Sequence, residues 1–229
     1  RGALVVRGEQ WGGVGGPVGV VGAVSGGWSQ GGCVGLRFAC RYPWRVSGLS
    51  LMGTQAGVED PEKVAIYQVM LDVWESEGLN DQLANTIASI VLGNEWLGSQ
   101  DWIAKWHQKS RSLLRQAFQT LVTRDDIHNR LGEIKAPALV IHGTADAAID
   151  IEKAHRMCSD LANCRGMVTI EGGGHASNLT HPKPVNLAIQ QFLAGLEVPT
   201  PPRFDLERRT SERREQTRAA GQIGAPIDR

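Results

Sequence analysis

Hydrophobic and polar positions divide the chain into short uncharged runs and longer segments at helical spacing. The uncharged runs are mostly aliphatic and have the length of strands; they cover residues 17–24, 46–52, 136–142 and 166–170. Continuous apolar runs of this length are typical of strands buried on both faces of a parallel sheet. Helix-like segments follow the runs, among them residues 151–161 and a last segment that begins near Pro182. The pattern therefore predicts an α/β fold with a mostly parallel sheet.

Residues from about 60 to 120 keep helical spacing without an intervening strand. Asn80 and Ser99 are expected to cap helix starts, and Gly93 is expected to end a helix. Several consecutive helices predict a lid inserted into the sheet domain. This insertion holds four of the seven tryptophans, namely Trp74, Trp96, Trp102 and Trp106. General burial tendencies favour packing of the lid on the body, with the lining of an apolar substrate pocket as the alternative.

The two ends of the chain differ in composition from the middle. Residues 1–16 form an irregular glycine-rich leader in which no dinucleotide fingerprint or phosphate loop is complete. Residues 198–229 are rich in charges of both signs and poor in apolar anchors, which predicts a disordered tail. One core domain over residues 17–197 is therefore expected, with the helical lid at about 60–120.

Charge and composition exclude several classes of function. Lys+Arg and Asp+Glu are both 24, so no nucleic-acid-binding or polybasic membrane-binding protein is expected. No apolar run has the length of a membrane span. The cysteines are too sparse for a disulfide scaffold and lack zinc-site spacing, which favours a reducing, cytoplasmic setting. The four are Cys33, Cys40, Cys158 and Cys164.

The stretch Gly27-Trp28-Ser29-Gln30-Gly31 joins the first uncharged run to a segment that can form a helix. A strand that turns sharply into a helix leaves no room for a Cβ two residues on either side of the turn, and glycine stands at both positions. Such a turn lifts the central side chain out of the sheet. Ser29 is therefore the candidate nucleophile, and the pattern needs support from downstream residues because the chain holds 28 glycines.

Two further polar residues follow predicted strands. Asp146 lies in the loop after the third uncharged run, and His175 lies in the glycine-rich loop after the fourth. Since ligands gather at the carboxyl ends of parallel strands, Ser29, Asp146 and His175 are expected to lie at one edge of the sheet. A serine hydroxyl needs a base, and the imidazole of that base needs a carboxylate to fix its tautomer. Asp150 is the main rival acid, but its place at the start of the next helix suits capping better.

Four other histidines have less specific expected roles. His142 is expected to pack at its strand end and His181 to cap the last helix before Pro182. His107 and His128 are expected to face solvent. None of these histidines has neighbours along the sequence that suggest a metal site.

Three motifs carry a resemblance to a known superfamily: G-W-S-Q-G-G at Ser29, P-A-L-V-I-H-G-T-A-D ending at Asp146, and G-G-G-H-A-S-N-L-T-H-P at His175. With the order Ser, Asp, His, residues from about 18 to 196 resemble α/β-hydrolases, in particular 3-oxoadipate enol-lactonases, carboxylesterases and cofactor-free haloperoxidases. The resemblance implies a mostly parallel sheet with helices on both faces and an inserted helical lid. It makes Ser29 the nucleophile, Asp146 the orienting acid and His175 the general base.

The same resemblance implies the rest of the site. The backbone N–H of Gln30 is expected to supply half of the oxyanion hole. Apart from the resemblance, the aromatic residues that are candidates for lining the substrate pocket are Trp28, Trp74 and Trp102. The implied reaction is hydrolysis of a small carboxylic ester or lactone through an acyl-enzyme, without cofactor or metal. Haloperoxidase-type chemistry or carbon–carbon bond hydrolysis by the same three residues is the alternative, because lid shape decides the substrate.

One departure from the family pattern changes this expectation. Family members carry several strands before the sharp strand-to-helix turn of the nucleophile, which is called the nucleophile elbow. These strands include an H-G loop that supplies the second oxyanion donor, whereas 28 residues precede Ser29 here. The N-terminal part of the fold is therefore expected to be incomplete. A truncated, weakly active or inactive hydrolase-like chain is accordingly the second class of function. Its exposed sheet edge would favour self-association.

Overall fold

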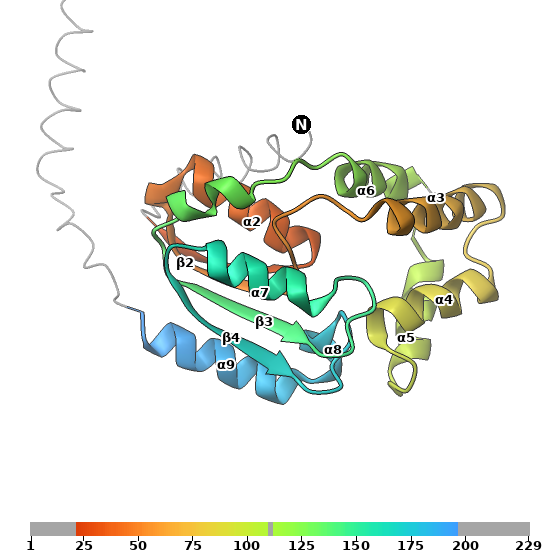
Figure 1. Ribbon diagram of the computed structural model, residues 1–229. Helices are drawn as coiled ribbons and strands as arrows, with labels where there is room; N and C mark the ends of the chain where they lie inside the picture. The colour runs from red at the N-terminus through yellow and green to blue at the C-terminus, as the bar shows by residue number, and fades with distance from the viewer. Residues whose placement is uncertain (1–21, 110–111, 197–229) are drawn as a thin grey trace, which may run out of the picture. The chain divides into compact units, whose positions relative to one another are not determined.

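The computed structural model describes residues 22–109 and 112–196, and the strands within them form a four-stranded parallel sheet (Figure 1). The strand order is sequential, with β1 at Ala23–Trp28, β2 at Val46–Met52, β3 at Ala138–Gly143 and β4 at Cys164–Ile170. Three of the predicted runs thus form strands within two residues of the expected bounds. The predicted leader at 1–16 and the predicted tail at 198–229 lie outside the described residues.

The first described strand reaches further along the chain than the predicted run. Of the strand predicted over residues 17–24, residues 17–21 lie outside the described residues, and β1 runs from Ala23 to Trp28, directly before Ser29. It is paired along its length with β2, for example Ser25 with Leu49. Glycines have low strand propensity, but this ladder holds the two glycines before Trp28 in extended conformation. Among the described strands, β1 pairs with β2 alone.

Helices cover both faces of the sheet. Three of them follow strands: α2 (Gln30–Arg41), α7 (Ile151–Asp160) and α9 (Pro182–Ala194). Side chains alternate along β3, so Val140 belongs to the core that α2 and α7 build on one face. Its neighbours Leu139 and Ile141 belong to the core that α9 builds on the other face. This arrangement confirms the predicted α/β fold with a parallel sheet and helices on both faces, because a sheet buried on both sides needs apolar residues at every position.

In the described residues between β2 and β3, where the sequence predicts a helical insertion, there are four helices: α3 (Pro61–Ser76), α4 (Asp81–Leu92), α5 (Ser99–His107) and α6 (Ser112–Val122). In Figure 1 the arrowheads of β3 and β4 point toward the side where α4 and α5 lie. The insertion therefore lies near the carboxyl ends of the strands, where ligands bind in open parallel sheets. The division of the chain into domains stays a prediction.

Two of the three predicted helix caps in this insertion form. The Asn80 side chain accepts a hydrogen bond of 2.8 Å from Leu83 N, and Gly93 ends α4 with a φ of 83°. The prediction for Ser99 is wrong, since Gly98 is the N-cap of α5 and Ser99 is its first helical residue. The Ser99 hydroxyl instead donates to Trp96 O at 2.7 Å. The side chain is therefore used within the preceding turn.

The loops around the sheet contain three short helices: η1 (Pro43–Arg45), η2 (His128–Glu133) and α8 (Ser177–Thr180). Among the residues described, none of the helices combines the length and the apolar character that a membrane span requires.

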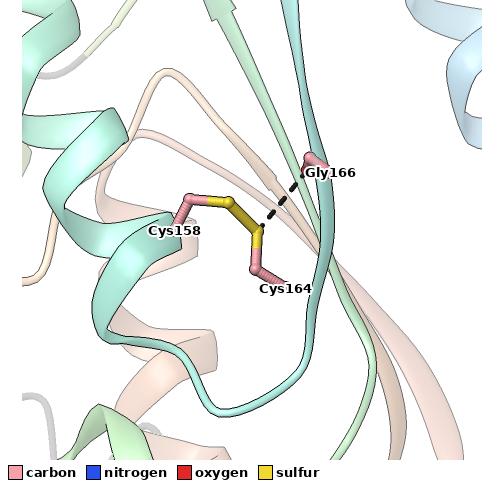
Figure 2. Close-up of a disulfide and its surroundings, with 3 residues drawn as sticks. All are labelled: Cys158, Cys164 and Gly166. Carbon is pink, nitrogen blue, oxygen red and sulfur yellow. Dashed lines mark hydrogen bonds between the residues drawn. A yellow bond between two sulfur atoms is a disulfide. The ribbon is translucent and has the colours of Figure 1, made fainter.

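One disulfide corrects the interpretation of the cysteines. Cys158 near the end of α7 is bonded to Cys164 at the start of β4, with their Cα atoms 5.5 Å apart (Figure 2). The pair is six residues apart, and the turn between α7 and β4 brings both side chains to the same place. The number of cysteines and their spacing in the sequence do not show that a turn brings two of them together, so the sequence did not predict this bond. The sparse cysteines therefore no longer support the predicted reducing compartment.

Candidate active site

Ser29 lies at a sharp turn between β1 and α2 in a conformation that side-chain-bearing residues rarely adopt. Its φ is 52° and its ψ is −121°, and it is the only non-glycine residue with positive φ in the described part of the chain. Strain of this kind costs on the order of 1–3 kcal/mol and persists only where neighbouring groups hold it. Here Ser29 N donates to Met52 O at 2.9 Å, and Thr54 Oγ1 donates to Ser29 O at 2.7 Å. The next strand and its loop therefore fix the turn that presents the hydroxyl.

The glycines around Ser29 are not equally necessary. A Cβ at Gly27 would lie 2.5 Å from Gly32 N, so glycine is required there, as the elbow pattern predicts. A Cβ at Gly31 would meet no heavy atom within 4 Å beyond its own helix and chain neighbours, so the predicted steric need at this position is wrong. The second crowded position is Gly32, where a Cβ would lie 2.5 Å from Thr54 Cγ2. The loop after β2, which the motif does not include, imposes this requirement.

The structure brings Ser29, His175 and Asp146 into one hydrogen-bonded chain. His175 Nε2 lies 2.9 Å from Ser29 Oγ, and His175 Nδ1 lies 2.9 Å from Asp146 Oδ2 and 3.1 Å from Asp146 Oδ1. A carboxylate only accepts hydrogen bonds, so Nδ1 carries the proton and Nε2 is free to accept from the serine hydroxyl. The three residues follow β1, β3 and β4, so the shared sheet edge creates the proximity. The arrangement can transfer a proton from Ser29 to His175.

The environment of Asp146 favours its ionised form. Its side chain is 1% exposed, and burial by itself would raise the pKa. The hydrogen bond and charge of His175, the N–H of Ile149 and the charge of His142 outweigh burial and hold the pKa of Asp146 below its usual value. Asp146 Oδ1 also accepts from Ala148 N at 2.9 Å and from Ile149 N at 3.0 Å. The carboxylate is therefore placed to orient His175 and to stabilise its charged form.

The rival acid Asp150 lies apart from this chain of hydrogen bonds. It is the N-cap residue of α7, as the sequence suggests, but its side chain makes no capping hydrogen bond. Its carboxylate forms an ion pair with Lys63 at 3.2 Å. Asp150 therefore has a structural contact with the insertion and no contact with His175.

The other histidines match their expected roles only in part. His142 is buried at the end of β3, as predicted, but its Nε2 also lies 3.3 Å from Asp146 Oδ2, a contact that the sequence does not suggest. The prediction that His128 faces solvent is wrong: its side chain is 8% exposed, with Nδ1 2.6 Å from Asp160 Oδ2. His107 is exposed, as predicted. His181 is the N-cap residue of α9 without a side-chain capping bond.

A cavity of about 180 Å³ opens beside Ser29 and His175. It lies between the four-helix insertion and the loops at the sheet edge, and most of its lining is apolar. The lining residues besides Ser29 and His175 are Glu59, Tyr67, Met70, Ile87, Ile90, Val91, Leu121, Arg124, Ala148 and Ile149. A substrate bound there would contact both the serine hydroxyl and the insertion.

The three predicted pocket tryptophans do not line this cavity. Trp28 donates its indole N–H to His175 O at 2.8 Å, and its ring lies 5.2 Å from the imidazole, so it supports His175 from behind. Trp74 is 5% exposed and buried in α3, which turns Tyr67 and Met70 to the cavity instead. Trp102 packs with Trp106 at 6.4 Å between ring centroids. The pocket prediction is wrong for reasons of position. Trp28 is the last residue of β1, and Trp74 lies on the same face of α3 as Tyr67 but two turns further along the helix, away from the cavity.

Two lining residues that sequence reasoning missed form a buried ion pair. Arg124 Nη2 lies 2.8 Å from Glu59 Oε2, with the side chains 2% and 3% exposed, and Arg124 Nε donates to Gly57 O at 2.9 Å. Glu59 precedes α3 and Arg124 follows α6, so the pair joins the two ends of the insertion. Opposite charges at the two boundaries of the predicted lid were the one sequence signal for this contact.

Gln30 is the first residue of α2, and its backbone N–H belongs to the amides that have no acceptor within the helix. These amides carry the positive end of the helix dipole, beside the serine hydroxyl. The Gln30 side chain donates to Ala117 O of α6 at 2.9 Å and so ties the elbow to the insertion. Over residues 22–109 and 112–196, no group of three or more His, Cys, Asp or Glu side chains is placed to hold a metal ion.

Comparisons with known proteins point to one family. A family model described as serine aminopeptidase S33 matches residues 22–178. The chain is 26% identical over 176 residues to RutD of Agrobacterium fabrum, a protein named as a carbamate hydrolase without firm assignment. The match covers 73% of this chain and 65% of the length of RutD. It is 27% identical over 188 residues to a pimeloyl-acyl-carrier-protein methyl ester esterase of Aromatoleum aromaticum, with 76% of this chain and 74% of the relative covered.

Solved structures show the same fold. A thermophilic esterase from Thermogutta terrifontis superimposes with a TM-score of 0.70 at 23% identity, over 83% of this chain and 72% of that one. A hydrolase from Pseudomonas aeruginosa PA01 gives a TM-score of 0.72 at 24% identity, over 83% and 71%. At this level of identity the likeness concerns the fold alone.

Proposed function

This chain belongs to the serine aminopeptidase S33 family of the α/β-hydrolase superfamily, and on that premise we propose that it hydrolyses a small carboxylic ester or lactone through an acyl-enzyme. The observation that carries the proposal is the hydrogen-bonded chain from Ser29 through His175 to Asp146, which opens into a cavity. The names of several relatives describe ester hydrolysis, which supports the choice of an ester over other bonds.

In the first half of the reaction, Ser29 Oγ attacks the acyl carbon while its proton passes to His175 Nε2. The carbonyl bond opens to an oxyanion, and the backbone N–H of Gln30 donates a hydrogen bond to it. Removing one such donor typically costs about 3–4 kcal/mol of transition-state stabilisation. His175 then returns the proton to the leaving alkoxide, the ester bond breaks, and the acyl group remains on Ser29.

In the second half, His175 Nε2 takes a proton from water, whose oxygen attacks the acyl carbon of the intermediate. Collapse of the second oxyanion releases the carboxylic acid, and the proton on His175 returns to Ser29 Oγ. Asp146 stabilises the imidazolium in both halves, and its lowered pKa keeps it ionised at neutral pH. Trp28 and Gly53 help to hold His175, the former by its indole hydrogen bond and the latter by close backbone packing.

Labelling with a fluorophosphonate probe tests the proposal, because the probe reports an activated serine without requiring the right substrate. Wild type should label and should hydrolyse 4-nitrophenyl butyrate, whereas Ser29→Ala should do neither. His175→Ala should label at least about 100-fold more slowly, since it lacks the base. Labelling that is the same in wild type and Ser29→Ala, or absent from a folded wild type, would contradict the proposal.

A further inference from the structure

The cavity beside Ser29 contains a buried ion pair that the proposed mechanism does not use. Arg124 and Glu59 both line the cavity, although their side chains are only 2% and 3% exposed. Most of the remaining lining is apolar. A buried ion pair loses the hydration of both charges, and well-packed apolar side chains in its place are often neutral or stabilising. Stability alone is therefore a weak explanation for this pair, and its contact with the cavity points to a ligand.

Arg124 retains hydrogen-bond donors for such a ligand. A guanidinium group has five N–H donors. Nε donates to Gly57 O and Nη2 to Glu59 Oε2, whereas Nη1 has no acceptor among residues 22–109 and 112–196. Tyr67 also lines the cavity, and burial, followed by the charges of Glu59 and Asp146, raises the pKa of Tyr67 to about 12. Its hydroxyl is thus protonated at neutral pH, so both side chains can donate to an oxygen of the bound molecule.

The charge of Glu59 decides which oxygen fits. Glu59 already neutralises Arg124, so an incoming carboxylate would bring an unpaired negative charge beside Glu59 and would lose its own hydration. An uncharged carbonyl, hydroxyl or ether oxygen accepts the same charge-assisted hydrogen bond without adding a charge. The pair therefore favours a neutral acceptor and disfavours an anion.

The acyl part of the substrate is the part that this cavity must hold. The alcohol of an ester leaves after the first half of the reaction, and the hydroxyl released from a lactone stays part of the acyl group. In both cases the acyl group stays on Ser29 through both halves. The volume of about 180 Å³ is below the roughly 300–1,000 Å³ of pockets for drug-sized ligands. The acyl group is accordingly short.

We propose that the cavity selects short acyl groups that carry a second, uncharged oxygen, which Arg124 and Tyr67 bind, and that Glu59 disfavours acyl groups that end in a carboxylate. This inference rests on the proposed ester hydrolysis at Ser29 and names the acyl class of that reaction.

Matched substrates test the selection in the wild-type protein. The first set comprises 4-nitrophenyl hexanoate, 4-nitrophenyl 5-oxohexanoate and mono-4-nitrophenyl glutarate, in which a methylene, a ketone and a carboxylate occupy the same position. A second set of pentanoate, 4-oxopentanoate and succinate esters covers a chain shorter by one carbon. Rates without protein are subtracted, because a neighbouring carboxylate accelerates spontaneous hydrolysis. In at least one set, kcat/KM should be roughly tenfold or more higher for the oxo ester than for the alkyl ester, and lowest for the carboxylate.

Substitutions assign the selection to the ion pair. In Arg124→Met, and in the double variant Glu59→Gln/Arg124→Met that leaves no unpaired charge, the ratio of oxo to alkyl ester should fall to about one. In Glu59→Gln, kcat/KM for the carboxylate ester relative to the alkyl ester should rise roughly tenfold or more. Arg115→Met is the matched control, because it removes an arginine from an exposed ion pair with Glu75 in the same insertion, and it should keep the wild-type ratio.

The outcomes separate this inference from the proposed function. A wild type that labels with fluorophosphonate and hydrolyses alkyl esters, but prefers neither oxo ester, would overturn the inference and leave the esterase proposal standing. The absence of label on a folded wild type would overturn both. If the Glu59 and Arg124 variants fail to fold by circular dichroism, the two wild-type substrate sets decide the matter.

Discussion

Alanine at the two glycines that flank Ser29 should have opposite effects on stability, although the elbow pattern treats the two positions alike. A Cβ at Gly27 would lie 2.5 Å from Gly32 N and 2.6 Å from Gly31 C and O. These are backbone atoms of the first turn of α2, so they cannot rotate away as the tip of a flexible side chain could. A Cβ at Gly31 would meet no heavy atom within 4 Å beyond its own helix and neighbours.

The two effects can be estimated from these distances. Overpacking typically costs about 1–3 kcal/mol of unfolding free energy, which is the expected loss for Gly27→Ala. Gly31 is helical, and alanine in a helix is roughly 0.5–1 kcal/mol more favourable than glycine, so Gly31→Ala should stabilise. The variants should therefore differ by roughly 1.5–4 kcal/mol. At about 2–4 °C per kcal/mol for a chain of this size, their Tm values should lie roughly 3–16 °C apart.

Thermal melting followed by circular dichroism measures the difference, and fluorophosphonate labelling shows whether the turn still presents Ser29. Gly27→Ala should melt below wild type and label more slowly, because α2 must shift to admit the methyl group. Gly132→Ala is a control for alanine at a site where a Cβ meets no heavy atom within 4 Å. An equal fall of Tm in Gly27→Ala and Gly31→Ala would refute the packing argument.

Three further predictions follow from the site and the disulfide. Ser29→Ala and His175→Ala should abolish esterase activity with Tm within a few degrees of wild type, and equal hydrolysis of a short 4-nitrophenyl ester by wild type and Ser29→Ala would contradict the assignment. Because the folded-state pKa of Asp146 is lowered, its ionised form contributes stability above its unfolded-state pKa, and this contribution is lost as the pH falls through the folded-state value. Asp146→Asn should accordingly lower Tm at pH 7, and the difference should shrink below about pH 4; a difference independent of pH would contradict this. Replacing Cys158 and Cys164 by serine should lower the free energy of unfolding by about 2 kcal/mol for so short a loop, which is measured as a fall in Tm. A reducing agent should lower the Tm of wild type by the same amount and should leave the Tm of the variant unchanged.

The strands, the helical insertion and the positions of Ser29, Asp146 and His175 at strand ends could be predicted from local signals. Apolar runs give strand positions because both faces of a parallel sheet are buried. The proximity of Ser29 and His175 could be predicted because parallel strands place their carboxyl ends at one edge of the sheet. The geometry of their hydrogen bonds needed the folded chain, since it depends on Met52 and Thr54, which hold the turn from the neighbouring strand.

The cavity lining could not be predicted, because it depends on which turn of each helix the fold places beside the sheet edge. The sequence predicts helices from about residue 60 to residue 120, but Tyr67 and Trp74 lie on the same face of α3, and only the packing of that helix decides that the turn with Tyr67 meets the cavity. The crowding at Gly32, the contact of His142 with Asp146 and the disulfide near β4 likewise depend on which segments the fold places side by side.

By itself, the sequence determined the α/β class and the residue types available for chemistry, because hydrophobic periodicity and glycine-flanked turns are local properties of the chain. Only the tertiary structure decided that Arg124 and Glu59, 65 residues apart, meet beside Ser29. A contact between distant segments depends on how the helices of the insertion pack on the body. That packing results from many weak interactions over the interface between the insertion and the body, so it cannot be predicted from any short stretch of sequence.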